Sequence, residues 1–308
     1  MPTATAPGKV ILLGEHAVVF GQPAIAAAID LRLRCKVARS GSTTLNGEAL
    51  SAAAHPYVCA ALRAVGEEGG YAIETDSTIP SGSGLGSSAA VSVAMIAALT
   101  SSTVKMREAD IAERAFEIES EVQGRASPID TSVSTHGHGV LVEGISGENL
   151  LWHIKRDKRE WFVHHCLVPK LSLVVGYTGV NAPTGPLVAK VKRYCDRTVF
   201  ARDIITEIGQ LTREAVPLLK KSDVVGLGEL MTKDHRLLAI LGVSTPQLNK
   251  LVEGCLPYSY GAKLTGAGGG GSMIALTDKI AKVEEAIKAR GSTPYVIRIG
   301  EPGVLIED

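Results

Sequence analysis

A run of glycine, serine and alanine around residue 85 carries the clearest potential for chemistry in this sequence. It reads Pro80, Ser81, Gly82, Ser83, Gly84, Leu85, Gly86, Ser87, Ser88, Ala89 and Ala90. Alternate glycines let the backbone adopt positive φ and pass close to a ligand. The alanine-rich residues that follow predict a helix, and the first turn of a helix has unpaired N–H groups that bind anions. The alternative is a flexible loop that only precedes a buried helix.

Ionisable residues lie at both ends of a short apolar run near the N-terminus. Residues 10–13 are apolar and bounded by turn residues, which predicts a buried strand. Lys9 precedes this run, and Glu15 and His16 follow it closely. One such residue alone is usually solvated or paired, but three around a single buried strand indicate a polar site.

Two carboxylates in the middle of the chain are candidates for metal binding and proton transfer. Apolar residues recur on one face of a helix predicted over residues 107–122, and Glu119 lies at the edge of that face. Asp130 follows a turn-rich segment, where aspartate is also a common helix cap. Because only a helix end and a turn separate them, the two carboxylates can meet at one site, with one holding a metal and one accepting a proton.

Two pairs of histidines raise the alternative of a different metal site. We expect His136 and His138 to share a face of one strand-like segment, and His164 and His165 lie in another. No third ligand stands near either pair in the sequence, and zinc sites need three or four. Structural or surface histidines are therefore the favoured interpretation.

A second glycine-rich segment lies near the C-terminus, between two predicted strands. It begins Gly266, Ala267, Gly268 and Gly269 and continues with two further glycines. Five glycines in six positions are costly in conformational entropy, so we expect a close approach of backbone to some neighbour here.

The sequence excludes one nucleotide-binding pattern and disfavours another. It contains no G-x-x-x-x-G-K-[ST], so a P-loop is excluded. Residues 84–89 fit G-x-G-x-x-G/A, but a Rossmann loop follows its first strand directly, whereas Pro80 and Ser81 intervene here. A dehydrogenase is the minor alternative.

Length and composition set the broad class. A chain of 308 residues exceeds most single hydrophobic cores, so two domains or one large domain are expected. The 32 Lys and Arg balance the 32 Asp and Glu, so overall charge gives no reason to expect nucleic acid or an acidic membrane as a partner.

Five scattered cysteines predict a reducing compartment, and the absence of a signal-like apolar segment at the N-terminus predicts a cytoplasmic protein. The apolar run 89–99 is too short for a bilayer and predicts a buried helix.

Hydrophobic periodicity and turn residues predict the remaining elements. We expect strands over residues 23–29, 71–75, 171–177 and 295–299, and helices over residues 51–64, 187–219, 224–241, 246–256 and 279–290. No internal repeat emerges.

Three segments together resemble the motifs of the GHMP kinases, which phosphorylate small-molecule hydroxyls with ATP. They are residues 6–16, residues 80–90 and residues 263–271, so the resemblance spans nearly the whole chain. Within the family, residues 14–26 are similar to the members that act on mevalonate and differ from those that act on galactose or homoserine.

The resemblance implies an α+β, two-domain fold with the active site between the domains. Residues 1–165 would form the N-terminal domain with the ATP loop, and residues 166–308 a ferredoxin-like C-terminal domain. The boundary is placed to within about ten residues. The implied substrates are ATP and mevalonate, with Mg²⁺ as cofactor. A homodimer is expected, and no nucleic acid or membrane partner.

The resemblance also assigns roles to individual residues. The loop of residues 80–90 would wrap the triphosphate, and Ser88, or alternatively Ser87, would hold Mg²⁺ with Glu119. Asp130 would be the catalytic base.

Other residues would bind the phosphate acceptor. The resemblance places Lys9 beside the acceptor hydroxyl, where it favours the alkoxide, and implies that Glu15 and His16 hold mevalonate. Thr184 matches a threonine near the substrate. A kinase for a phosphorylated acceptor and a non-catalytic ligand-binding relative are the alternatives; the first should need extra Lys or Arg in its pocket.

Overall fold

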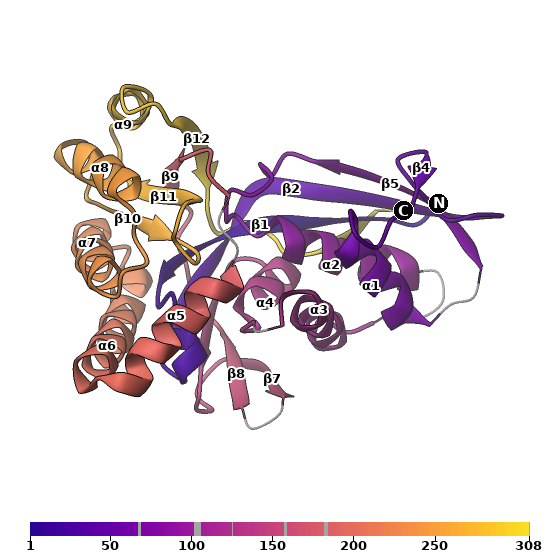
Figure 1. Ribbon diagram of the computed structural model, residues 1–308, viewed down its shortest axis with the longest axis horizontal. Coiled ribbons are helices and arrows are strands. Elements are labelled where there is room, and N and C mark those ends of the chain that lie inside the picture. The colour runs from indigo at the N-terminus through magenta and orange to yellow at the C-terminus, as the bar shows by residue number, and fades with distance from the viewer. Residues whose placement is uncertain (67–68, 102–105, 125, 157–158, 182–183, 308) are drawn as a thin grey trace.

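The computed structural model describes residues 1–66, 69–101, 106–124, 126–156, 159–181 and 184–307. Within this part of the chain the strands form a nine-stranded and a four-stranded sheet (Figure 1). The strands are β1 (Thr3–Leu13), β2 (Ala24–Ser40), β3 (Thr44–Leu45), β4 (Glu48–Ala49), β5 (Gly70–Ser77), β6 (Gly139–Glu143), β7 (Leu150–Arg156), β8 (Arg159–His165), β9 (Ser172–Tyr177), β10 (Gly261–Thr265), β11 (Ser272–Leu276), β12 (Thr293–Arg298) and β13 (Leu305–Glu307).

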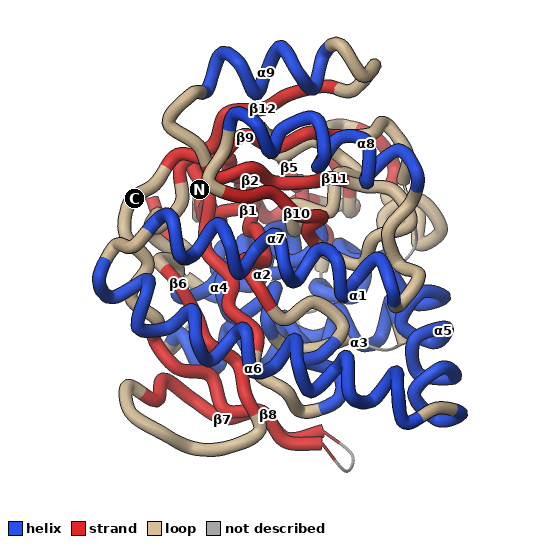
Figure 2. The backbone as a smooth tube through the Cα atoms, turned by 90° about the vertical axis from the view of Figure 1, so that its left-hand side faces the viewer, coloured by secondary structure: helices blue, strands red, loops and turns tan. Residues whose placement is uncertain are grey.

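Helices cover both sheets. They are α1 (Pro56–Val65), α2 (Ser87–Thr100), α3 (Glu108–Gln123), α4 (Ile129–His136), α5 (Thr184–Arg197), α6 (Val199–Lys221), α7 (Val224–Ile240), α8 (Pro246–Cys255) and α9 (Ile280–Lys288), with short 3₁₀ helices η1 (Ala17–Phe20) and η2 (Leu256–Tyr258). In Figure 1, α1 to α4 lie on one side of the long strands β1, β2 and β5. Helices α7 to α9 pack on the smaller sheet at the other end of the molecule, and α6 packs beside α7, as Figure 2 shows from the side.

The long strand β2 organises the larger sheet. Strand β1 pairs antiparallel along one of its edges, and β5 and β6 share the other edge in succession. Every residue of β1 is buried, although its register shifts between Pro7 and Lys9. The strand predicted at residues 10–13 therefore begins earlier, at Thr3, because a bulge lets it continue through Pro7 and Gly8.

The smaller sheet has the order β10-β11-β9-β12, with all its pairs antiparallel. Helices α5 to α8 connect β9 to β10, and α9 connects β11 to β12. This is the βαββαβ arrangement of a ferredoxin-like unit, and it confirms the predicted α+β fold. The proposed domain boundary near residue 165 falls at the end of β8. Strand β13 returns to pair with β1, so the last described strand joins the sheet that the first one forms.

For two predicted helices, the observed bounds differ from the predicted ones. The pattern over residues 187–219 is divided into α5 and α6, because Thr198 is extended and its hydroxyl accepts a hydrogen bond from the Ala201 amide as the cap of α6. Helix α1 begins at Pro56, a favoured first position, and ends at Gly66, which has φ +68°.

Helix α2 is the predicted buried helix. From Ala89 to Thr100 all but one residue is buried, and alanines let the neighbouring helices and strands approach closely. No helix in the described ranges combines the length and apolar character that crossing a membrane requires.

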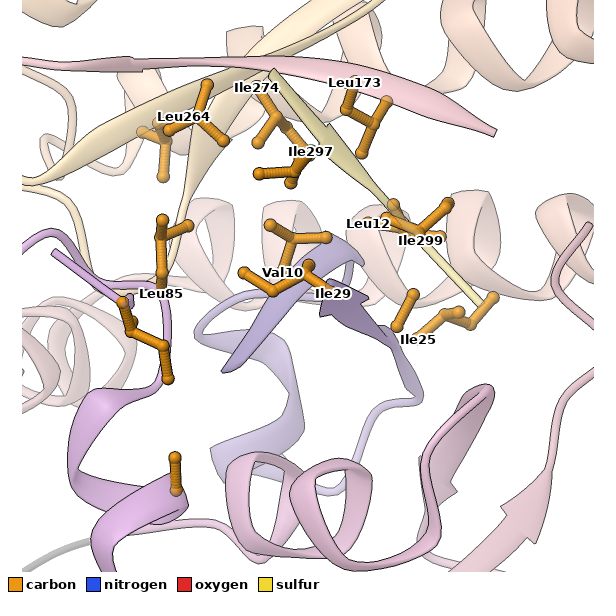
Figure 3. Packing of buried hydrophobic residues seen from close by; sticks show 14 of the residues in the cluster. Val10, Leu12, Ile25, Ile29, Leu85, Leu173, Leu264, Ile274, Ile297 and Ile299 are labelled. Atoms are coloured by element: carbon orange, nitrogen blue, oxygen red, sulfur yellow. The ribbon is translucent and has the colours of Figure 1, made fainter. Parts of the chain in front are cut away.

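One hydrophobic cluster connects the two sheets. Figure 3 shows Val10, Leu12, Ile25 and Ile29 of the larger sheet facing Leu173, Leu264, Ile274 and Ile297 of the smaller one. Because these side chains are almost completely excluded from water, the packing between the sheets is a core rather than a hinge.

Shortening Ile29 to alanine should therefore destabilise the whole molecule. Ile29 is fully buried, and the cavity left by Ile29→Ala is expected to lower the free energy of unfolding by about 2–5 kcal/mol. The matched control is Ile145→Ala, since Ile145 is 64% exposed, and its effect should stay within about 0.5 kcal/mol. Urea denaturation followed by circular dichroism measures both, and equal effects would contradict a core at this position.

Candidate active site

A cavity of about 670 Å³ opens between the N-terminal strand, the glycine-rich loop and helices α3, α4 and α5. Most of the predicted site residues line it, although they come from distant parts of the chain. They are Lys9, Glu15, His16, Pro80, Ser81, Gly82, Ser83, Gly84, Gly86, Ser87, Ser88, Glu119, Asp130, Thr184, Gly266 and Ala267. Among the predicted residues, Leu85, Ala89, Ala90, Gly268 and Gly269 do not line it.

The glycine-rich loop has the predicted backbone conformation. Gly82, Gly84 and Gly86 have φ of 70°, 78° and 81°, and Gly86 leads directly into α2. The Ser272 hydroxyl donates to the Ser83 carbonyl at 2.7 Å, so β11 of the smaller sheet supports the loop from behind. The first turn of α2 begins at the cavity, because Ser87 and Ser88 both line it.

Lys9 connects this loop to the predicted base. Its ammonium group is 3.0 Å from Asp130 Oδ2 and donates to the Gly84 carbonyl at 3.1 Å. Lys9 is only 3% exposed, whereas Asp130 is 26% exposed and faces the cavity. The arrangement holds a positive charge and a carboxylate side by side where an acceptor hydroxyl can reach them.

Asp130 occupies the first turn of α4, with Pro128 rather than Asp130 in the capping position. A carboxylate there is stabilised by the helix dipole. The alternative that Asp130 merely caps the helix is therefore wrong.

Ser88 and Glu119 meet, as the predicted metal pair requires. The Ser88 hydroxyl donates to Glu119 Oε1 at 3.0 Å, which distinguishes it from Ser87. Glu119 is 2% exposed, and burial together with nearby Asp130 raises the pKa of its carboxyl to about 8. Hard oxygen donors of this kind suit Mg²⁺, which usually takes one or two carboxylates plus substrate phosphates.

The structure adds residues that the sequence analysis missed. Gln123 donates to Glu119 Oε1 at 3.2 Å and to the Tyr57 hydroxyl at 3.1 Å, so it orients the carboxylate. Gln123 follows Glu119 by one helical turn, and that spacing could have identified it. Tyr57 and Asn181 line the cavity without any recognisable sequence signal.

His16 is a neutral hydrogen-bonding group. Its Nε2 lies 2.8 Å from the Ala267 carbonyl and therefore carries the proton that it donates. Burial lowers the pKa of His16 to about 4, and Nδ1 is left as an acceptor with no partner among the described atoms. A ligand hydroxyl in the cavity could donate to this nitrogen.

Glu15 has a buried partner. Its Oε1 pairs with the ammonium of Lys263 on β10, and the residue is 1% exposed at the edge of the cavity. Burial raises the pKa of the Glu15 carboxyl to about 8. Lys263 lies inside a motif segment, but its partners could not be found from the sequence because they lie far away along the chain.

The second glycine-rich segment allows backbone segments to pack closely. A Cβ on Gly268 would lie 2.2 Å from the Val243 carbonyl oxygen, and one on Gly270 would lie 2.7 Å from that of Val180. The predicted close approach exists, and at these two positions the neighbour is protein backbone. Gly266 and Ala267 alone among its residues reach the described cavity lining. Thr184 begins α5 at the cavity rim.

The prediction that His136 and His138 share a face of one strand-like segment is wrong. His136 ends α4 instead of lying in a strand, which turns its ring toward His165 of β8, with the two nitrogens 3.0 Å apart. The rings of all three lie within about 6 Å of one another. Among the described residues, no group of three or more histidine, cysteine or acidic side chains has the geometry to hold a metal ion.

Comparisons with known proteins identify the family. Residues 52–138 match the GHMP kinases N terminal domain, and residues 215–293 match the GHMP kinases C terminal. The chain is 37% identical to mevalonate kinase from Pyrococcus abyssi, over 99% of this chain and 97% of that protein. It is 36% identical to mevalonate kinase from Archaeoglobus fulgidus, over 99% of both.

Two solved structures are similar over nearly their whole length. The crystal structure of the Methanococcus jannaschii mevalonate kinase has a TM-score of 0.77 and 28% identity, covering 97% of this chain and 98% of that one. The L. major mevalonate kinase in complex with R-mevalonate has a TM-score of 0.80 and 26% identity, covering 97% and 95%. The chain belongs to the GHMP kinase family and is an ATP-dependent kinase. The two archaeal relatives described above, at 37% and 36% identity, are mevalonate kinases.

Substituting Gly86 should disrupt the site without unfolding the chain. A Cβ there would lie 2.7 Å from Lys9 Cγ and push the ammonium away from Asp130. A displacement of this size is expected to reduce kcat by about a hundredfold in Gly86→Ala.

The matched control is Gly124→Ala. Gly124 also has positive φ, 77°, but a Cβ there meets nothing within 4 Å. The Gly124→Ala variant should therefore have the same kind of backbone strain as Gly86→Ala but keep the wild-type kcat. ADP release in a coupled assay measures both variants, and comparable losses would show that strain alone is responsible.

Proposed function

We propose that this chain transfers the γ-phosphoryl group of ATP to the 5-hydroxyl of (R)-mevalonate, giving 5-phosphomevalonate and ADP. The observation that carries the proposal is the contact of Lys9 with both Asp130 and the glycine-rich loop, at a cavity that Ser88 and Glu119 also line. Full-length similarity to mevalonate kinases supports the substrate.

In the proposed reaction, Asp130 accepts the proton of the acceptor hydroxyl. Lys9, 3.0 Å from that carboxylate, stabilises the oxygen as it becomes an alkoxide. Phosphoryl transfer depends on positioning and charge stabilisation, and both side chains are already held in place by buried contacts.

The loop of residues 80–88 would bind the triphosphate through its backbone N–H groups and the N-terminus of α2. Ser88 and Glu119 would hold Mg²⁺, which neutralises phosphate charge when it is bound. Gln123 would keep the Glu119 carboxylate oriented, since it donates to the same oxygen as Ser88.

Mevalonate would occupy the part of the cavity next to His16 and Thr184. The unpartnered Nδ1 of His16 would accept a hydrogen bond from an acceptor hydroxyl. Glu15 would support this end of the site through its position beside His16.

The charges of the cavity favour mevalonate over a phosphorylated acceptor. Among the described residues that line it, Lys9 is the single Lys or Arg. A second phosphate group beside a triphosphate would need further cations.

A non-catalytic relative is disfavoured because the chain has both the base and the metal pair. The resemblance further predicts a homodimer and a place in isoprenoid synthesis, and the cytoplasmic location stays a prediction from the N-terminal sequence.

The substrate assignment predicts a selective response in a panel of acceptors. Coupled ADP release should be rapid with (R)-mevalonate and close to background with phosphomevalonate, because the described lining offers no second Lys or Arg for its phosphate. It should also be close to background with homoserine and galactose, because the relatives that support the assignment are mevalonate kinases. Preferential turnover of phosphomevalonate would instead support the alternative kinase.

Replacing the base predicts a catalytic defect with intact nucleotide binding. Asp130→Asn keeps the shape of the side chain but removes the proton acceptor, and kcat should fall by about 10²–10⁴-fold. Binding of ATP, measured by calorimetry, should change little. Asp110→Asn is the control, since Asp110 lies outside the cavity lining in a surface ion pair with Arg107. Unchanged kcat in Asp130→Asn would remove Asp130 from the mechanism.

A further inference from the structure

Three buried charged side chains meet beside the active-site cavity, and the reaction described above uses none of them directly. They are Glu15 in the turn after β1, Lys263 of β10 and Asp234 of α7, referred to below as the buried triad. Their exposed fractions are 1%, 0% and 0%. Lys263 Nζ pairs with Glu15 Oε1 and lies 3.3 Å from Asp234 Oδ2.

The charges of the triad do not balance when all three groups are ionised. One ammonium faces two carboxylates, which leaves one negative charge in a water-free interior, and an uncompensated buried charge is costly. One proton shared by the two carboxyl groups removes the excess. Glu15 Oε2 and Asp234 Oδ1 have no hydrogen-bond partner among the described atoms, while Asp234 Oδ2 faces the Lys263 ammonium at 3.3 Å, so acceptor positions for that proton exist.

The pKa shifts of the two carboxyl groups agree with one shared proton. Burial raises the pKa of Glu15 to about 8 and also raises that of Asp234, while Lys263 opposes both effects. The other titratable groups facing Lys263 among the described residues are His16 and His235. Burial lowers the pKa of each to about 4, so neither changes charge near neutrality.

The triad lies where it can control the acceptor end of the site. Glu15 directly precedes His16, and His16 contacts Ala267, which follows β10. Thr265 of the same strand accepts from the Ile11 amide at 3.0 Å and donates to the Ile11 carbonyl at 3.2 Å. The turn of residues 14–16 and the end of β10 are therefore held together by these bonds and the triad.

We propose that the buried triad positions His16 and the Gly266–Ala267 segment for the acceptor, and that it does so only while one of its two carboxyl groups is protonated. Glu15, Lys263 and Asp234 are thus positioning residues that act through His16. This inference rests on the proposed function, because mevalonate is the acceptor whose binding reports the position of His16.

The test is the pH dependence of kcat/KM for mevalonate at saturating Mg-ATP. For the wild-type chain it should fall about tenfold between about pH 7 and pH 9, since a carboxyl with a pKa of about 8 changes from mostly protonated to mostly ionised over that range. The loss should appear in KM for mevalonate and leave KM for ATP unchanged.

Asp234→Asn removes the second carboxylate while preserving shape. Glu15 and Lys263 then balance each other at every pH in this range, and the alkaline loss should disappear. If Asp234→Asn does not fold, Glu15→Gln removes the other carboxyl group of the triad. The alkaline loss of kcat/KM should then disappear in the same way. Asp30→Asn, at a surface ion pair with Arg298, is the control and should keep the wild-type profile.

The possible outcomes separate the two proposals. Absence of mevalonate turnover by the wild-type chain overturns the proposed function and this inference with it. Turnover with the same alkaline profile in wild type and Asp234→Asn overturns the inference alone. So does a variant that only lowers the melting temperature while both KM values and the profile stay as in wild type.

Discussion

An ammonium group shielded from water must have oxygen partners, and Lys9 imposes this requirement on three separate segments. Strand β1 carries Lys9, the glycine-rich loop supplies the Gly84 carbonyl, and α4 supplies Asp130. Loss of any one partner would leave a buried charge incompletely paired. The cost of that loss keeps the predicted base and the phosphate loop in one geometry before any ligand arrives, which is the preorganisation that phosphoryl transfer needs.

A second buried lysine serves the other half of the molecule with a different charge balance. Lys9 forms an ion pair with one carboxylate, and that carboxylate remains partly open to the cavity. Lys263 faces two carboxylates, and none of the three groups is exposed. The first pair is balanced and accessible, which suits chemistry, whereas the second is enclosed and needs a proton for balance, which suits a structural connection between the sheets.

Small residues make these close arrangements possible. Gly86 must lack a side chain because Lys9 occupies the space where a Cβ would lie, and the alanines of α2 allow β1 to pack against it. Gly268 likewise has no side chain where the Val243 carbonyl packs against it. The glycine motifs therefore serve protein packing as well as access for a ligand.

The sequence by itself determined the features that depend on local backbone and residue type. The positive φ of the loop glycines and the helix that follows them were predicted correctly, because both follow from residue types along a single element. The α+β class was predicted from the resemblance of three motif segments. Glu119 was expected at the edge of a buried face and is instead only 2% exposed. Only the tertiary structure decided which side chains meet. Glu15 finds Lys263 at a separation of 248 residues, and His136 meets His165 because a helix ends where a strand was expected. Such contacts depend on how the sheets and helices pack against each other, which no local pattern encodes.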